Sequence, residues 1–253
     1  MALFFICLSV KHNYLYSVKP NIMKSSIFLA LLMAAGLTAG AQSVEKKLKV
    51  NDVSQIVYNV DQGTSTKNGP YVVKNLSNDG VWLQGNYKNN ARSGNWYFFS
   101  KDNKMTLRYN YDQKKLAFVD TAALTNVSVE ILSSDEAAKN NASAPLPLCS
   151  IDYYLQLMAN SIYAINDGRN QGLDAEITAT IATDGTASYT VNYVVDKKKT
   201  ATQRLVVPNN KFAIEWIPSM YNNKPVESKF TVYATMKGND SISSATRRFR
   251  WDN

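Results

Sequence analysis

Histidine and cysteine are almost absent from this sequence. The 253 residues include one histidine and two cysteines, and His12 and Cys7 both lie in an N-terminal segment that resembles a removable signal. Without that segment, zinc sites of the usual His/Cys kind lack ligands, and Ser–His–Asp or Cys–His nucleophile pairs lack their base. Cys149 alone cannot form an internal disulfide, so the fold must depend on burial. We expect no catalytic residues, no cofactor and no metal.

The N-terminal segment has the order of a secretory signal. Met23 and Lys24 precede an apolar run at 27–33 and small residues that end in Ala-Gly-Ala at 39–41, an A-x-A cleavage site. We expect Met23 to be the true start and residues 1–41 to be absent from the mature chain, which begins near Gln42. An N-terminal anchor that is retained is the alternative. The mature chain is then exported, to the periplasm, the outer membrane or the medium, with no transmembrane span.

Long runs of one charge are also missing. The formal charge of +8 falls to +5 without residues 1–41, which contain three lysines and no acidic residue. The remaining basic residues alternate with acidic ones, so no nucleic-acid partner is expected.

What the sequence does contain is a strand–turn repeat between residues 67 and 120. The Asn-Tyr pair at Asn86 recurs at Asn110, an offset of 24 residues, and each copy precedes a polar turn. Alternate residues of a strand face opposite ways, so Trp96 and Phe98 share one face and the intervening residues share the other. This pattern predicts an antiparallel meander, a single-layer sheet, over 42–132.

A partner of this sheet would meet the aromatic residues on its exposed face. The sequence predicts a candidate binding surface made of Tyr87, Tyr97, Phe99 and Tyr111. Burial inside the sheet is the competing interpretation for each ring, because aromatic side chains supply much of the apolar area of a core.

The same stretch resembles the MORN-repeat variant of exported bacterial proteins and antitoxin-type proteins. The unit reads approximately Gly-x-Tyr-Lys-Asn-Gly-Lys-x-x-Gly-x-Trp-x-Tyr, and Asn90 stands where its second glycine is usual. The resemblance implies a curved sheet with a contact role and no catalytic residues. The matching residues are Gly85, Tyr87, Lys88, Asn89, Gly94 and Trp96.

Residues 133–148, "SSDEAAKNNASAPLPL", predict a linker between two domains, because they are poor in large apolar residues and contain two prolines. A helix should follow, with Ser150 as N-cap. Its apolar stripe consists of Ile151, Leu155, Met158, Ile162 and Ile165. These spacings place the five side chains on one helical face, which should pack on a sheet.

That sheet is predicted by alternating strands on both sides of a turn at Asp184 and Gly185, and by a later strand through Phe230 and Val232. Phe249 and Trp251 add an edge strand. Helix and strands together predict an α+β module over 149–253, so the chain as a whole is mainly β.

This second half resembles the C-terminal domain of TonB-type energy transducers. The family reads approximately Trp-x-Pro-Ala-x-x-Asn-Gly-Lys-Pro-Val before its final strand. The resemblance implies protein contact through a sheet edge. A linker of about 16 residues spans at most about 60 Å, too short for the arm of a transducer. The matching residues are Trp216, Pro218, Asn222, Lys224, Pro225 and Val226.

The sequence therefore favours an exported, non-catalytic adaptor of the bacterial cell envelope that binds protein or glycan. One alternative is a component of a TonB-dependent uptake system. A second is a glycan hydrolase that uses carboxylates alone, for which Asp174 and Glu176 are candidates.

Overall fold

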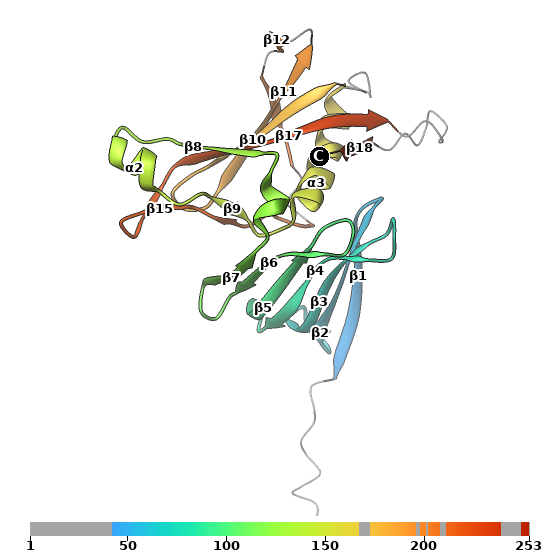
Figure 1. Ribbon diagram of the computed structural model, residues 1–253. Coiled ribbons are helices and arrows are strands. Elements are labelled where there is room, and N and C mark those ends of the chain that lie inside the picture. Colours follow the sequence, from blue (N-terminus) through green and yellow to red (C-terminus); the bar gives the residue numbers. More distant parts are fainter. Residues whose placement is uncertain are drawn as a thin grey trace, which may run out of the picture. The chain divides into compact units, whose positions relative to one another are not determined.

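The first half of the described chain is a seven-stranded antiparallel sheet in which each strand pairs with its neighbour in sequence (Figure 1). This confirms the predicted meander. We call it the first sheet. Its strands are β1 (Ser43–Asn51), β2 (Ser54–Asp61), β3 (Lys67–Asn75), β4 (Val81–Lys88), β5 (Ala91–Phe99), β6 (Met105–Asn110) and β7 (Lys115–Val119).

The computed structural model describes residues 42–166, 173–195, 198–200, 202–207, 211–238 and 249–252. The predicted signal segment lies outside these residues. The chain from Ser43 onward forms one compact unit. No helix in the described part of the chain is long and apolar enough to cross a membrane.

Turns and glycines of the first sheet follow the sequence pattern. Asn89 and Asn90, between β4 and β5, have φ angles of 50° and 66°, a left-handed conformation that asparagine accepts. Gly85 lies beneath the indole of Trp96, and a Cβ added there would overlap the ring. The glycine of the predicted repeat is therefore required for close packing between β4 and β5.

The second sheet is also antiparallel, but its strands come from distant parts of the chain. β10 (Asp174–Ile181) and β11 (Ala187–Val195) form the predicted hairpin, with Gly185 at a φ angle of 82° in the turn. β17 (Ser228–Gly238) pairs with β10. The remaining strands of this sheet are β8 (Val127–Ile131), β12 (Lys198–Lys199), β13 (Gln203–Leu205) and β18 (Phe249–Asp252).

The predicted helix is α3 (Ile151–Asn166), and the Ser150 side chain accepts a hydrogen bond from the Tyr153 backbone N–H. Ile151, Leu155 and Met158 of the predicted stripe are buried. The side chains of Ile162 and Ile165 lie outside the described residues.

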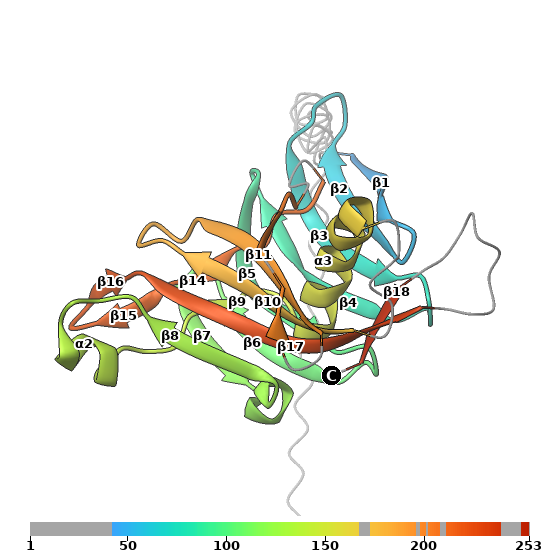
Figure 2. The ribbon, with the colours of Figure 1, turned by 90° about the horizontal axis from the view of Figure 1, so that it is seen from above.

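Side chains on more than one face of α3 are buried, because the helix lies between the two sheets and contacts both (Figure 2). The Tyr153 ring stacks on Trp82 of β4 at 5.3 Å between centroids. On another side of the helix, the Tyr154 ring packs against Phe230 of the second sheet. The Asp152 carboxylate accepts a hydrogen bond of 2.8 Å from the Lys101 backbone N–H. Both sheets therefore share one apolar core.

The segment predicted as a linker is folded onto the second half. It contains the short helix α2 (Glu136–Asn141) and strand β9 (Leu146–Pro147), which pairs with β14 (Trp216–Ile217). β8 lies inside the predicted first domain but pairs with β17. The division at 133–148 stays a prediction.

Three further small elements lie in the described part of the chain: a 3₁₀ turn at Thr121–Leu124, and the hairpin of β15 (Ser219–Tyr221) and β16 (Lys224–Val226). Asn222 and Asn223 turn this hairpin at φ angles of 49° and 59°. Cys149 is a buried free thiol, and burial raises its pKa.

Candidate binding site

Six aromatic side chains cross the inner face of the first sheet, the face that packs on the shared core. Neighbouring ring centroids along this row lie 4.9 to 6.1 Å apart. Aromatic pairs at such distances stabilise a fold beyond the area that they bury. We call Tyr58, Tyr71, Tyr87, Trp96, Tyr109 and Tyr111 the inner aromatic row.

Arg92 lies on this row, and its side chain is only 9% exposed. The guanidinium carbon is 4.4 Å from the centroid of the Trp96 ring and 5.3 Å from that of Tyr111. A buried guanidinium needs a partner of opposite charge, because desolvation of an unpaired ion is costly. Glu215, from the second half of the chain, supplies this partner with an N–O distance of 3.2 Å.

Tyr111 fixes the other oxygen of Glu215. The Tyr111 hydroxyl donates to Glu215 Oε2 at 2.8 Å and accepts from the Arg92 guanidinium at 2.5 Å. Burial raises the pKa of Tyr111, although the nearby Arg92 opposes this, so the phenol remains a donor at neutral pH. The two contacts hold the carboxylate in place, and the Glu215 side chain is still 46% exposed to solvent.

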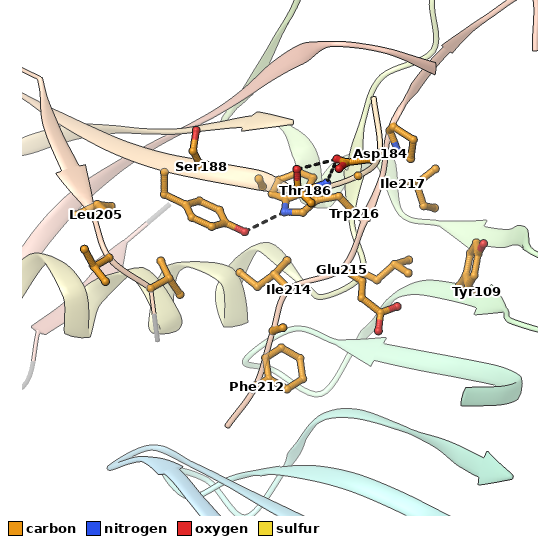
Figure 3. A pocket seen from close by; sticks show the side chains of 18 of the residues that line it. Tyr109, Asp184, Thr186, Ser188, Leu205, Phe212, Ile214, Glu215, Trp216 and Ile217 are labelled. Atoms are coloured by element: carbon orange, nitrogen blue, oxygen red, sulfur yellow. Dashed lines mark hydrogen bonds between the residues drawn. The ribbon is translucent and has the colours of Figure 1, made fainter. Parts of the chain in front are cut away.

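A pocket of about 680 Å³ lies beside Glu215, between the end of β6 and the β10–β11 hairpin (Figure 3). This volume is within the range of small-molecule sites, about 300–1,000 Å³. Tyr109 and Tyr111 form one wall and Arg204 belongs to another. The remaining lining comes from Leu148 and from residues 184–189, 205–207 and 212–218.

The wall opposite Tyr109 is held by hydrogen bonds (Figure 3). The Trp216 indole N–H donates to the Tyr189 hydroxyl at 3.0 Å. Asp184 accepts from the Thr186 backbone N–H at 2.8 Å and from the Thr186 hydroxyl at 2.7 Å. These bonds lower the pKa of Asp184, so it is ionised at neutral pH.

The structure does not bring the four residues of the predicted binding surface together. Tyr87 and Tyr111 belong to the inner aromatic row, where both are half-buried against the shared core, and Tyr111 also lines the pocket. Whether either residue binds a partner stays a prediction. Tyr87 lies two residues after Gly85, so both face the same side of the sheet, and this is the side on which the Trp96 ring packs. Tyr97 and Phe99 lie on the opposite, outer face and are partly exposed. Their role in binding stays a prediction.

Tyr97 pairs with Arg108, which pairs with Phe118 of β7. The Phe118 side chain is 39% exposed. We call Tyr97, Phe99, Arg108 and Phe118 the outer patch.

The residues of the two predicted motifs lie in turns, in the lining of the pocket and on the surface. Gly94 has a φ angle of 63°, and its N–H donates to Asp112. Trp216 and Pro218 line the pocket, whereas Pro225 is exposed in β16. The carboxylates proposed for a hydrolase are elsewhere: Asp174 accepts a hydrogen bond from Thr235 and Glu176 is part-buried on the same strand.

Sequence reasoning missed Arg92, Tyr109, Arg204 and Glu215. The turn at Asn89 and Asn90 places Arg92 opposite Tyr87. The hairpin pattern in the sequence could therefore have predicted that Arg92 lies beside the aromatic residues. No local signal connects Arg92 to Glu215, because their contact depends on how the two halves pack.

Comparisons with models of protein families, with curated proteins and with solved structures found no significant match. Among the described residues, no group of three or more His, Cys, Asp or Glu side chains could hold a metal ion.

Proposed function

We propose that this protein is an exported, non-catalytic binding protein of the bacterial cell envelope, and that the pocket beside Glu215 is its ligand site. The observation that carries this proposal is the fixed carboxylate. Arg92 and Tyr111 orient it from inside the fold, while the Glu215 side chain as a whole remains 46% exposed. Orientation in advance lowers the cost of ordering a side chain on binding.

Export is supported by the signal-like order of residues 1–41. The partner is an envelope protein or glycan, because these are the macromolecules that an exported chain of this kind meets. The resemblances to MORN-type repeats and to the TonB C-terminal domain point in the same direction, since both imply contact functions.

Retention on envelope preparations tests the binding function. The exported chain should bind saturably to the envelope of its source bacterium, and Ala213→Trp should reduce retention about tenfold. Ala213 is exposed and lines the pocket, so a larger side chain obstructs the site without entering the core. Ala117→Trp, at an exposed alanine of β7, is the matched control and should retain binding. Equal retention by both variants would contradict the proposed site.

A glycan hydrolase is the second candidate, because Asp184 and Glu215 line the same pocket. A hydrolase of this type needs one carboxylic acid with a raised pKa to protonate the leaving group. The pKa of Asp184 is instead lowered, by hydrogen bonds from Thr186, and Glu215 is ion-paired with Arg92. These interactions favour binding over hydrolysis.

Release of reducing sugar from envelope polysaccharide would decide between the two candidates. We expect no release. Activity that is lost in both Asp184→Asn and Glu215→Gln would establish the hydrolase instead.

A further inference from the structure

We propose that the ligand of this pocket is an uncharged glycan, whose hydroxyl groups donate to Glu215 and whose C–H face packs on Tyr109. This inference rests on the proposed binding function and adds the chemical class of the ligand.

The Glu215 carboxylate has acceptor capacity left for a ligand. Two carboxylate oxygens offer about four lone-pair directions. Arg92 contacts Oε1 and the Tyr111 hydroxyl contacts Oε2, and the side chain is 46% exposed. A charged acceptor forms stronger hydrogen bonds with hydroxyl donors than a neutral acceptor does. Neighbouring hydroxyl groups on one sugar ring supply such donors in pairs.

The charge balance of the site favours a neutral donor over a cation. Among the residues that the structure describes, the charged ones that line the pocket are Asp184, Arg204 and Glu215, and Arg92 lies directly behind Glu215. Their formal charges sum to zero. An ammonium group that approaches Glu215 is attracted by the carboxylate but repelled by the guanidinium 3.2 Å behind it. A hydroxyl group gains the hydrogen bond without this repulsion.

The apolar part of the lining suits the C–H face of a sugar. Tyr109 is partly exposed at the end of the inner aromatic row, and its ring is held in a T-shaped contact with Tyr111 at 4.9 Å between centroids. Ile214 and Ile217 add aliphatic surface to the lining of the same pocket (Figure 3). A rigid aromatic ring offers contact area at a low cost in conformational entropy.

An extended peptide fits this wall less well. Peptide capture by strand addition needs a row of open backbone N–H and C=O groups. Here the Glu215 carbonyl accepts from the Leu148 N–H at 2.8 Å, and Trp216 and Ile217 pair with β9. The backbone on this side is already used, so recognition depends on side chains.

Calorimetric titration of the exported chain with defined trisaccharides tests the proposal. The probes are trimers of glucose, mannose and N-acetylglucosamine, together with the deacetylated trimer of glucosamine. The last two have the same sugar backbone and differ in one group on every ring, a neutral acetamide or an amine. The titrations are run in mildly acidic buffer, in which the amine is protonated to an ammonium. At least one uncharged trimer should bind, and the glucosamine trimer should bind more weakly than its acetylated counterpart.

Variants then locate the binding. Tyr109→Ala should weaken the uncharged trimer about tenfold, whereas Tyr109→Phe retains the ring and should change affinity less than about twofold. Tyr97→Ala in the outer patch is the matched control and should leave the affinity for the trimer unchanged. Glu215→Gln should also lose about tenfold, and Arg92→Met/Glu215→Gln repeats this test without leaving a buried charge unpaired.

The outcomes separate this inference from the proposed function. Tighter binding of the glucosamine trimer, or unchanged affinity in Tyr109→Ala and Glu215→Gln, overturns the uncharged glycan. If no uncharged trimer binds but Ala213→Trp still reduces retention on the envelope, the proposal of an uncharged glycan is wrong and the proposed binding function is retained. If neither trimer nor envelope binds, both proposals fall.

Discussion

Trp96 and Tyr97 are adjacent in β5 but lie in different environments. The Trp96 side chain is fully buried among the inner aromatic row, and Tyr97 lies in the partly exposed outer patch. The same strands supply both faces, so the difference comes from what covers them. Tyr153 of α3 and Glu215 contact the inner face from the second half of the chain. An aromatic pattern in a strand therefore indicates a binding residue only after the covering elements are known.

The largest expected effect follows from this comparison. Trp96→Ala removes a fully buried indole and should lower the free energy of unfolding by about 3–5 kcal/mol, through lost burial and the cavity left behind. Tyr97→Ala should cost about 1 kcal/mol or less, because its ring packs on one exposed face. Urea titration of both variants measures the difference. Equal losses would contradict the assignment of the two faces.

Gly85 sharpens the comparison at the level of one methyl group. Gly85→Ala places a Cβ against the Trp96 indole, and overpacking of this kind should cost about 1–3 kcal/mol. Gly63→Asn is the control, because no atom lies within 4 Å of a Cβ at Gly63 and asparagine tolerates its φ angle of 76°. Urea midpoints should fall for the first variant only.

The ion pair between Arg92 and Glu215 should respond unequally to loss of its two partners. Glu215→Ala leaves a buried guanidinium unpaired and should cost about 1–3 kcal/mol. Arg92→Met leaves a carboxylate that water can reach, and should cost about 1 kcal/mol or less because the methionine still packs on Trp96. Thermal unfolding of both variants tests this order, and the reverse order would show that Arg92 is not the buried partner.

Tyr189, on the far wall of the pocket, gives a smaller and pH-dependent effect. Burial raises its pKa to about 12, against the opposing hydrogen bond from Trp216. The unfolded phenol ionises near pH 10. The contribution of the protonated Tyr189 side chain to folding stability is therefore complete below about pH 10 and is lost as the pH rises toward 12. Tyr189→Phe loses the indole hydrogen bond, about 0.5–1.5 kcal/mol at neutral pH.

Ionisation of the buried phenol costs more than the lost hydrogen bond is worth, so the stability advantage of the wild type over Tyr189→Phe should shrink and then reverse between about pH 10 and 12. Urea titrations across this interval measure this advantage. A wild-type advantage that stays constant or grows with pH would contradict the burial of this phenol.

The first sheet could be predicted because its information is local. Turn residues at Asn89 and Asn90 and strict alternation around Trp96 specify a hairpin within a short stretch. The Asp184-Gly185 hairpin and the start of α3 at Ser150 were predicted for the same reason.

The pocket could not be predicted from such signals. The contact of Glu215 with Arg92 and that of Tyr153 with Trp82 join residues far apart in sequence, and neither half shows a pattern that requires them. Tyr87 and Tyr111 were assigned to an exposed face because alternation gives the face of a residue but not what lies on it.

Footprinting with hydroxyl radicals, read by mass spectrometry, is the most direct test of whether the ligand binds in the pocket beside Glu215. The exported chain would be oxidised with and without saturating envelope preparation, and the oxidation of each tyrosine compared. Binding at the pocket predicts protection of Tyr109, with Tyr97 unchanged. Protection of Tyr97 with Tyr109 unchanged would place the ligand on the outer patch and contradict the proposed site.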